Sequence, residues 1–112
     1  MKILIVDDIR TPDNIFLADA TLALYKDVEW DLAVNYNDAV NKIMNHEYDV
    51  ITLDHDLGEN KTGYDIANLL EYMVHCEQFP VKTEIRVHSA NPVGVARINQ
   101  VIKSIERFRN AR

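Results

Sequence analysis

The stretch Asp49–Gly58 reads Asp-Val-Ile-Thr-Leu-Asp-His-Asp-Leu-Gly and passes directly from a short apolar run into a polar cluster. Such a run predicts a buried strand, and the acids and the imidazole that follow it mark the carboxyl end of that strand. Two other strands end in the same way: Lys2–Val6 leads into Asp7-Asp8-Ile9-Arg10, and Thr83–Val87 leads into His88-Ser89-Ala90-Asn91-Pro92. If these strands are parallel neighbours, all three clusters meet at one edge of one sheet.

Strands and helices are predicted to alternate along the whole chain. The four predicted strands are Lys2–Val6, Val28–Val34, Asp49–Leu53 and Thr83–His88. In Val28–Val34 apolar and polar residues alternate, which is typical of an edge strand with one solvated face. Strands that are each followed by a helix predict a parallel sheet with right-handed crossovers and helices on both faces.

Each predicted helix has a recognisable start. The starts are Thr11-Pro12, Asn35 or Asn37, Thr62, and Asn91-Pro92. Ser, Thr and Asn side chains cap helix amino termini, and proline is well tolerated at the first helical position. In the second helix, Val40, Ile43 and Met44 have the spacing of residues that pack inward.

Composition sets limits on the class of protein. The chain has 112 residues, 47% of them hydrophobic, which predicts a single domain over residues 1–112. Apolar runs are too short for a membrane span, and Cys76 is the only cysteine, so we expect a cytoplasmic protein without an intrachain disulfide. The formal net charge of −6 argues against general DNA binding. The sequence leaves the oligomeric state open.

Acidic residues at the ends of two strands predict a metal site. Asp7 and Asp8 follow the first strand and Asp54 ends the third, so their carboxylates lie close together if these strands pair. Crowded carboxylates repel one another and commonly recruit a hard cation such as Mg²⁺. The alternative is that one acid caps the next helix and another forms an ion pair with Arg10.

Two histidines are candidates for acid–base chemistry. His55 and His88 each lie in a polar cluster at a strand end, and imidazole titrates near neutral pH. Hydrolysis of a cyclic phosphodiester needs one group to activate water and another to protonate the departing ribose oxygen. The alternative is that each imidazole is structural and is hydrogen-bonded to the backbone.

Three further residues are candidates for binding phosphate. Arg10 offers a planar cation, Ser89 a hydroxyl and Asn91 an amide. The helix that begins at Asn91-Pro92 also offers free N–H groups at its amino terminus. Asn91 can equally act as a simple helix cap, and the two roles are compatible.

Part of this pattern resembles a response-regulator receiver domain. The resemblance rests on the opening Ile-Leu-Ile-Val-Asp7-Asp8, on Asp54 and on Ser89-Ala90. It implies a receiver-like (flavodoxin-like) three-layer α/β/α fold with strand order 2-1-3-4, in which Asp7 and Asp8 bind Mg²⁺ and Asp54 accepts a phosphoryl group. Receivers also have a fifth strand that carries a lysine. We expect about four strands here, without the fifth strand–helix unit.

A closer resemblance covers nearly the whole chain. The stretches that carry it are Asp7–Pro12, Leu53–Gly58, Thr62–Asp65 and Arg86–Gly94, which look like the cyclic-phosphate processing receiver-like domains of bacteria and their phages. The long His-Ser-Ala-Asn-Pro-Val-Gly string makes this resemblance specific. It implies a role with 2′,3′-cyclic phosphate ends in RNA repair or metabolism. It also places Asp56 in the site, where it is a further candidate metal ligand with Asp7, Asp8 and Asp54.

Three functions follow as hypotheses. The leading one is a phosphodiesterase-type hydrolase that acts on a cyclic-phosphate nucleotide or RNA end, with His55, His88 and Asp54 as catalytic residues, Arg10, Ser89 and Asn91 as phosphate ligands, and Mg²⁺ as an expected cofactor. The second is a signalling receiver phosphorylated on Asp54, against which the absence of a fifth-strand lysine weighs. The third is a non-catalytic module that binds a nucleotide or a protein.

Overall fold

A computed structural model of the chain describes residues 2–8, 29–76, 82–89 and 91–111. The strands are β1 (Lys2–Val6), β2 (Glu29–Ala33), β3 (Val50–Leu53) and β4 (Glu84–Val87), and the helices are α2 (Tyr36–Asn45), α3 (Gly63–His75) and α4 (Pro92–Asn110). The helix expected to start at Thr11-Pro12 and the candidate ligand Arg10 lie outside the described residues.

The four strands form one parallel sheet in the order β2-β1-β3-β4, which confirms the predicted order 2-1-3-4. The predicted edge position of the second strand is confirmed as well. Val6 pairs in register with Leu53, and Leu53 pairs with Val87, so three strands end at one level. The register therefore brings Asp7, Asp54 and His88, the residues that directly follow these strands, to the same level of the sheet.

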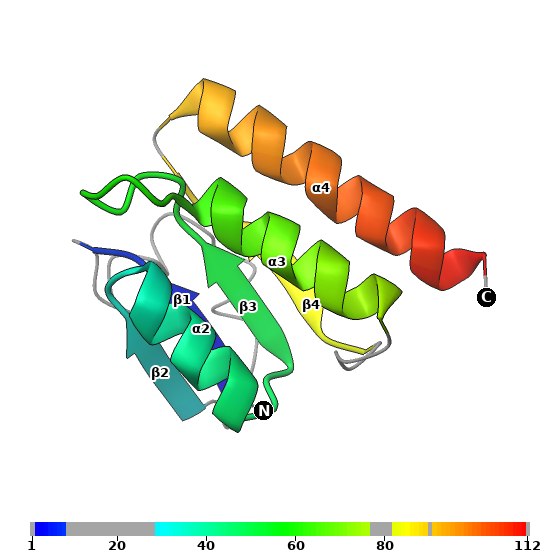
Figure 1. Cartoon of the computed structure of the whole chain (residues 1–112), viewed down its shortest axis with the longest axis horizontal. Coiled ribbons are helices and arrows are strands. Elements are labelled where there is room, and N and C mark those ends of the chain that lie inside the picture. The colour runs from blue at the N-terminus through cyan, green and yellow to red at the C-terminus, as the bar shows by residue number, and fades with distance from the viewer. Residues whose placement is uncertain (1, 9–28, 77–81, 90, 112) are drawn as a thin grey trace.

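All three described helices cover one face of the sheet, and α3 lies alongside α4 (Figure 1). The strand residues that face these helices form a continuous core with them; the fully buried members include Leu4, Val6, Ile51, Leu53, Ile66, Leu70 and Ile98. The alternate strand residues, among them Ile3, Ile5 and Thr52, are also fully buried. Burial of each large aliphatic side chain stabilises the fold by about 1.5–3 kcal/mol. No helix in the described part of the chain combines the length and apolar character of a membrane span.

The helix starts follow the predicted chemistry. Asn35, one of the two predicted caps, accepts a hydrogen bond from the Asp38 N–H at 2.8 Å. Thr62 opens α3 with a capping box, in which its own N–H donates to the Asp65 carboxylate at 2.7 Å. These contacts satisfy amide groups that have no partner within the helix, and they fix where each helix begins.

One expected core residue of α2 is not in the core. Met44 is 60% exposed, whereas Ala39 and Ile43 are the buried residues of that helix. The prediction for Met44 was therefore wrong. Because α2 packs over the edge of the sheet at β2, only a narrow stripe of the helix is covered, and the small Ala39 lies in it.

A buried phenol stabilises the link between β2 and the start of β3. The Tyr48 hydroxyl donates to Asp31 Oδ2 at 2.6 Å, and this bond is the main cause that holds the pKa of Asp31 below its usual value. We expect Tyr48→Phe to lower the free energy of unfolding by about 1 kcal/mol at neutral pH. A lowered carboxyl pKa stabilises the fold above the unfolded-state pKa and ceases to do so as the pH falls through the folded-state pKa. The deficit of the variant should therefore shrink in acid.

Urea unfolding from neutral into acidic pH measures this difference. The matched control is Tyr36→Phe, because Tyr36 is partly buried and its hydroxyl has no hydrogen bond within the described structure. An equal loss of stability in both variants, or a deficit that grows in acid, would contradict the assigned role of the Asp31 bond.

Candidate functional site

Three carboxylates meet where β1 and β3 end. One oxygen each from Asp7, Asp8 and Asp54 lies within 4.8 Å of the other two. The strand ladder places two of them, because Asp7 N–H donates to Ala33 O and Asp54 N–H donates to Val6 O, both at 2.9 Å. Asp7 and Asp54 are buried, whereas Asp8 is partly exposed. Carboxylate oxygens in this number and spacing fit a hard divalent cation, which would offset their mutual repulsion.

His88 is bound tightly to this acidic cluster. Its Nε2 lies 2.9 Å from Asp7 Oδ2, and its Nδ1 lies 2.7 Å from Thr52 Oγ1. The side chains of His88 and Asp7 are 1% and 0% exposed. A ring that carries its proton on Nε2 satisfies both contacts, because Nε2–H donates to Asp7 and the Thr52 hydroxyl donates to Nδ1. The imidazole thus orients Asp7 from inside the protein.

Thr52 is a site residue that the sequence analysis missed. It lies in the buried strand β3, two positions before Asp54, and its side chain is fully buried. Side chains two positions apart in a strand point to the same face, so a hydroxyl in an otherwise aliphatic strand was the available signal. A buried hydroxyl needs a hydrogen-bond partner, and His88 provides it.

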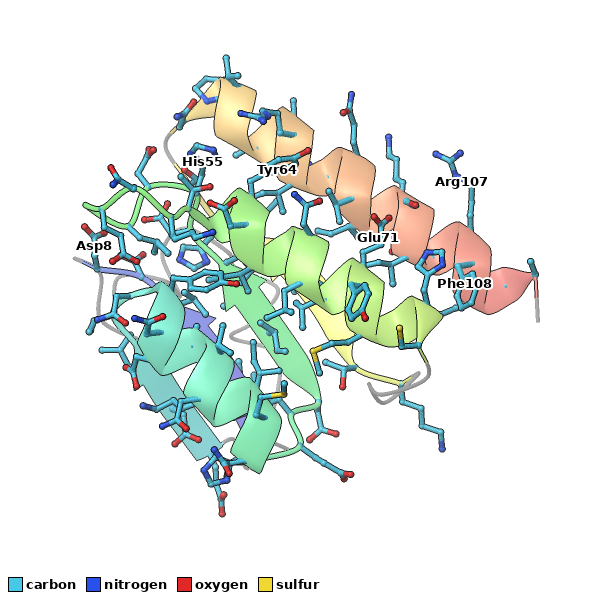
Figure 2. The ribbon with its side chains drawn as sticks, viewed as in Figure 1. Asp8, His55, Tyr64, Glu71, Arg107 and Phe108 are labelled. Carbon is cyan, nitrogen blue, oxygen red and sulfur yellow. The ribbon has the colours of Figure 1, made fainter. Side chains whose placement is uncertain are left out.

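His55 lies in a different setting, on the loop after β3 (Figure 2). Its side chain is 13% exposed, and its Nδ1 lies 3.0 Å from Asp56 Oδ1. Within the described structure its Nε2 has no hydrogen-bond partner. Asp56 therefore holds one ring nitrogen and leaves the other available to a ligand, which is the arrangement of an oriented acid–base histidine.

Two glycines allow the helices to approach this loop closely. A Cβ on Gly94 would lie 2.3 Å from His55 Cγ, so the imidazole packs directly on the first turn of α4. A Cβ on Gly63 would lie 2.0 Å from the carbonyl oxygen of Asp54, and the Gly63 N–H donates to His55 O at 2.9 Å. The loop is thereby held between the amino termini of α3 and α4.

The start of α4 joins the phosphate-binding candidates to this loop. Asn91 Oδ1 accepts from the Gly94 N–H at 3.1 Å, and the Asn91 N–H donates to Ser89 Oγ at 3.1 Å. Asn91 Nδ2 also donates to Asp56 Oδ2 at 3.4 Å. The hydrogen bond from His55 is the main cause of the lowered pKa of Asp56, with a smaller contribution from Asn91. Asn91 is thus a helix cap, which was one of its two predicted roles. It also contacts Asp56, the acid that orients His55.

A stacked pair was not among the sequence candidates. The guanidinium carbon of Arg97 lies 4.2 Å from the centroid of the Tyr64 ring, which joins the first turn of α3 to the second turn of α4 by a cation–π contact. Tyr64 directly follows Gly63, whose N–H donates to His55 O, so the ring of this pair lies near the loop that carries His55; Figure 2 labels Tyr64 and His55.

The predicted residues form two adjoining groups. Asp7, Asp8, Asp54 and His88 make up the first, and His55, Asp56, Ser89 and Asn91 make up the second. The cluster of potential metal ligands in the described structure consists of Asp7, Asp8 and Asp54, and Asp56 lies outside it, paired with His55.

The sheet order, the acids at its carboxyl edge and the helices over one face define a receiver-like α/β domain. The chain belongs to the family of cyclic-phosphate processing receiver domains, which matches residues 2–104. This finding confirms the closer of the two resemblances. A search of curated proteins found no match.

Among solved structures the fold is similar to that of a response regulator protein from Burkholderia pseudomallei. That crystal structure contains a phosphorylated aspartic acid, a calcium ion and citrate. The TM-score is 0.62 at 19% sequence identity, and the alignment covers 94% of this chain and 64% of the other. At this identity the similarity establishes the fold alone, and this chain spans less than two thirds of the response regulator's length.

The acidic cluster predicts opposite effects of one substitution on stability and on cation binding. Asp8→Asn keeps the side-chain shape, removes a repelling charge and removes a charged ligand. We expect a higher midpoint of thermal unfolding without divalent cations, and a roughly tenfold or greater loss of Mg²⁺ affinity. Calorimetric unfolding and titration measure the two effects. The exposed Glu47→Gln, which lies outside the cluster, is the control and should change neither. Unchanged Mg²⁺ affinity in Asp8→Asn would remove Asp8 from the cation site.

The contact between Gly94 and His55 predicts a local rearrangement. Gly94→Ala inserts a methyl group where the imidazole lies, so the ring must shift, and we expect the shift to disturb its hydrogen bond to Asp56. Because the hydrogen bond from His55 is the main cause that lowers the pKa of Asp56, this pKa should rise toward its ordinary value. Carboxyl ¹³C titration by NMR measures the shift. Gln100→Ala, an exposed position on the same helix, serves as the control. If the pKa of Asp56 is the same in Gly94→Ala, the ring does not depend on this contact.

Proposed function

We propose that this chain binds a cyclic phosphodiester at the carboxyl edge of its sheet and hydrolyses it to a phosphomonoester. The observation that carries the proposal is the pairing of an oriented, partly exposed imidazole with a cluster of carboxylates on adjoining residues. His55 Nδ1 is held by Asp56 at 3.0 Å, and the adjacent residue Asp54 belongs to the cluster that includes Asp7 and Asp8. Membership of the cyclic-phosphate processing family supports this substrate class.

His55 is the residue we assign to proton transfer. In this hydrolysis a water oxygen bonds to phosphorus, one ribose oxygen–phosphorus bond breaks, the water gives up a proton and the departing oxygen gains one. His55 Nε2 can exchange a proton with either oxygen while Asp56 holds the other ring nitrogen. Which of the two transfers it performs stays open.

His88 stays a predicted site residue, and its surroundings suggest a positioning role. Both ring nitrogens are engaged inside the protein, by Asp7 at 2.9 Å and by Thr52 at 2.7 Å. It would therefore act through Asp7 by fixing the direction of that carboxylate. Loss of the ring would leave Asp7 and Thr52 buried without this partner, which costs stability as well as activity.

The remaining groups have supporting roles. Asp7, Asp8 and Asp54 would hold Mg²⁺, which supplies electrostatic stabilisation of the phosphate oxygens when it is bound. Ser89 and the amino terminus of α4 would donate hydrogen bonds to the same phosphate, and Arg10 and Asn91 stay predicted ligands. An RNA end as the natural substrate is a prediction that rests on the family resemblance.

The second candidate is a receiver phosphorylated on Asp54. The observation in its favour is the position of Asp54, which ends β3 within the acidic cluster of a receiver-like fold. Incubation with a small acyl phosphate and Mg²⁺ followed by intact-mass measurement separates the two candidates. A phosphoryl adduct that disappears in Asp54→Asn favours the receiver, and no adduct counts against it.

Phosphorus NMR with a 2′,3′-cyclic mononucleotide tests the leading proposal. We expect the cyclic signal to convert into a phosphomonoester signal in the presence of Mg²⁺ and to persist in EDTA. His55→Ala should slow the conversion by roughly 10²-fold or more at a temperature where the variant is folded, because acid–base catalysis contributes about 10²–10⁴-fold.

His46→Ala is the matched control. His46 is an exposed histidine near Lys2, the first residue of β1, and so lies at the amino-terminal end of the strands, away from the site. Turnover by His55→Ala at the wild-type rate would exclude the assigned proton transfer. A cyclic signal that never changes with the wild-type protein would exclude hydrolysis of cyclic mononucleotides.

A further inference from the structure

Strand β4 is the last strand of the sheet in the order β2-β1-β3-β4. In the described part of the chain β4 pairs with β3 on one side, and no strand pairs with its other side. The N–H groups of Glu84 and His88 donate toward the β3 side, to Asp49 O and Leu53 O. Backbone groups alternate in direction along a strand, so the N–H and C=O groups of Ile85 and Val87 point to the outer edge.

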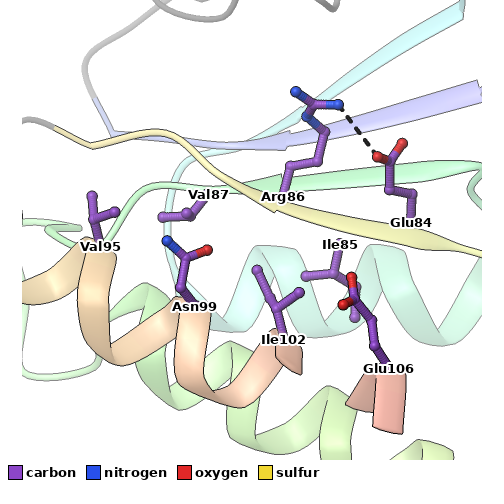
Figure 3. A pocket seen from close by; sticks show the side chains of 8 residues that line it. All are labelled: Glu84, Ile85, Arg86, Val87, Val95, Asn99, Ile102 and Glu106. Carbon is purple, nitrogen blue, oxygen red and sulfur yellow. Dashed lines mark hydrogen bonds and ion pairs between the residues drawn. The ribbon is translucent and has the colours of Figure 1, made fainter. Parts of the chain in front are cut away.

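A groove of about 460 Å³ runs between this edge and α4. Its lining residues are Glu84, Ile85, Arg86, Val87, Val95, Asn99, Ile102 and Glu106 (Figure 3). Ile85 packs with the core on the helix side of β4, whereas the side chains of Glu84 and Arg86 lie on the opposite side of the strand (Figure 3). The edge thus has an apolar side beside α4 and a charged side away from it.

We propose that β4 is a dimerisation strand that pairs antiparallel with β4 of a second copy of this chain. The twofold axis passes through Ile85, so that Ile85 of each copy exchanges two backbone hydrogen bonds with Ile85 of the other. Thr83 then lies opposite Val87 of the second copy, but its carbonyl oxygen already accepts from Arg109 Nη1 at 2.7 Å, so the proposed pairing rests on the hydrogen bonds at Ile85. The two four-stranded sheets become one continuous sheet.

Charge selects this partner and this register. With Ile85 opposite Ile85, Glu84 lies directly opposite Arg86 of the second copy, and Arg86 opposite Glu84. These are non-hydrogen-bonded pairs, in which the side chains of antiparallel strands approach most closely. Within one chain the two side chains already meet at 3.3 Å, so both lie on the same side of the strand. The strand is therefore complementary to itself.

The neighbouring register is disfavoured by the same residues. If the twofold axis passed through Arg86, the two guanidinium groups would face each other directly, and Ile85 would lie opposite Val87. Like charges in directly opposed positions destabilise a strand pair. In the proposed register, Ile85 and Val87 of the second copy point toward the helix side and cover the groove beside Ile102 and Val95.

Charge-reversal variants test the pairing by sedimentation velocity over a range of protein concentrations. A short edge buries little area, so we expect a reversible dimer that forms in the micromolar range. Arg86→Glu places acids opposite acids and should weaken dimerisation at least tenfold. Glu84→Arg places cations opposite cations and should do the same.

Two further samples separate pairing from misfolding. An equimolar mixture of Arg86→Glu and Glu84→Arg should form a heterodimer, because every opposed pair is then complementary. The double exchange, Glu84→Arg with Arg86→Glu, should restore the homodimer. Amide hydrogen exchange of Ile85 and Val87 should slow as concentration rises, whereas exchange of the Arg86 amide, which points toward β3, should not depend on it.

A wild-type chain that stays monomeric at all concentrations would overturn the proposal. So would a dimer that both reversals leave intact, or single variants that fail to rescue each other in the mixture although each is folded. None of these results depends on turnover of a cyclic phosphate.

Discussion

A single buried imidazole links the ends of three strands. His88 follows β4, and its ring contacts Asp7, which follows β1, and Thr52, which lies in β3. Because Val6, Leu53 and Val87 are in register, Asp7 and His88 start at one level, whereas Thr52, in register with Ile5 and Arg86, starts two positions earlier; the ring contacts both. The direction of Asp7, and with it the shape of the acidic cluster, depends on these two hydrogen bonds.

The two histidines of the site have different surroundings and therefore different abilities. His88 is enclosed and has both nitrogens engaged, so it can hold a neighbour in place but has no free nitrogen to offer a ligand. His55 packs on Gly94 and is held through one nitrogen by Asp56, so the other nitrogen can take part in proton transfer. Burial separates the roles of two residues that have the same chemistry.

The sequence was sufficient to predict the strand order, the helix starts at Thr62 and Asn91, and the meeting of the acids at one sheet edge. The helix starts and the meeting of the acids follow from local patterns: caps, apolar runs, and polar residues at strand ends. The strand order followed from the resemblance to receiver domains. The partner of His88 and the close approach of Gly94 to His55 could not be predicted, because each depends on how distant segments pack. The prediction that Met44 packs inward was wrong for a related reason. Helical spacing shows which side chains share a face, but not how wide a stripe of that face is covered.

The hydrogen bond between Asp7 and His88 joins residues that are 81 positions apart. Contacts over such a separation require the closure of a long loop, which costs conformational entropy that only the assembled sheet offsets. A partly folded chain in which β4 has not yet joined the sheet has its acids but lacks the ring that orients them. Ligand binding that needs the oriented cluster therefore requires β4 to be paired in the sheet.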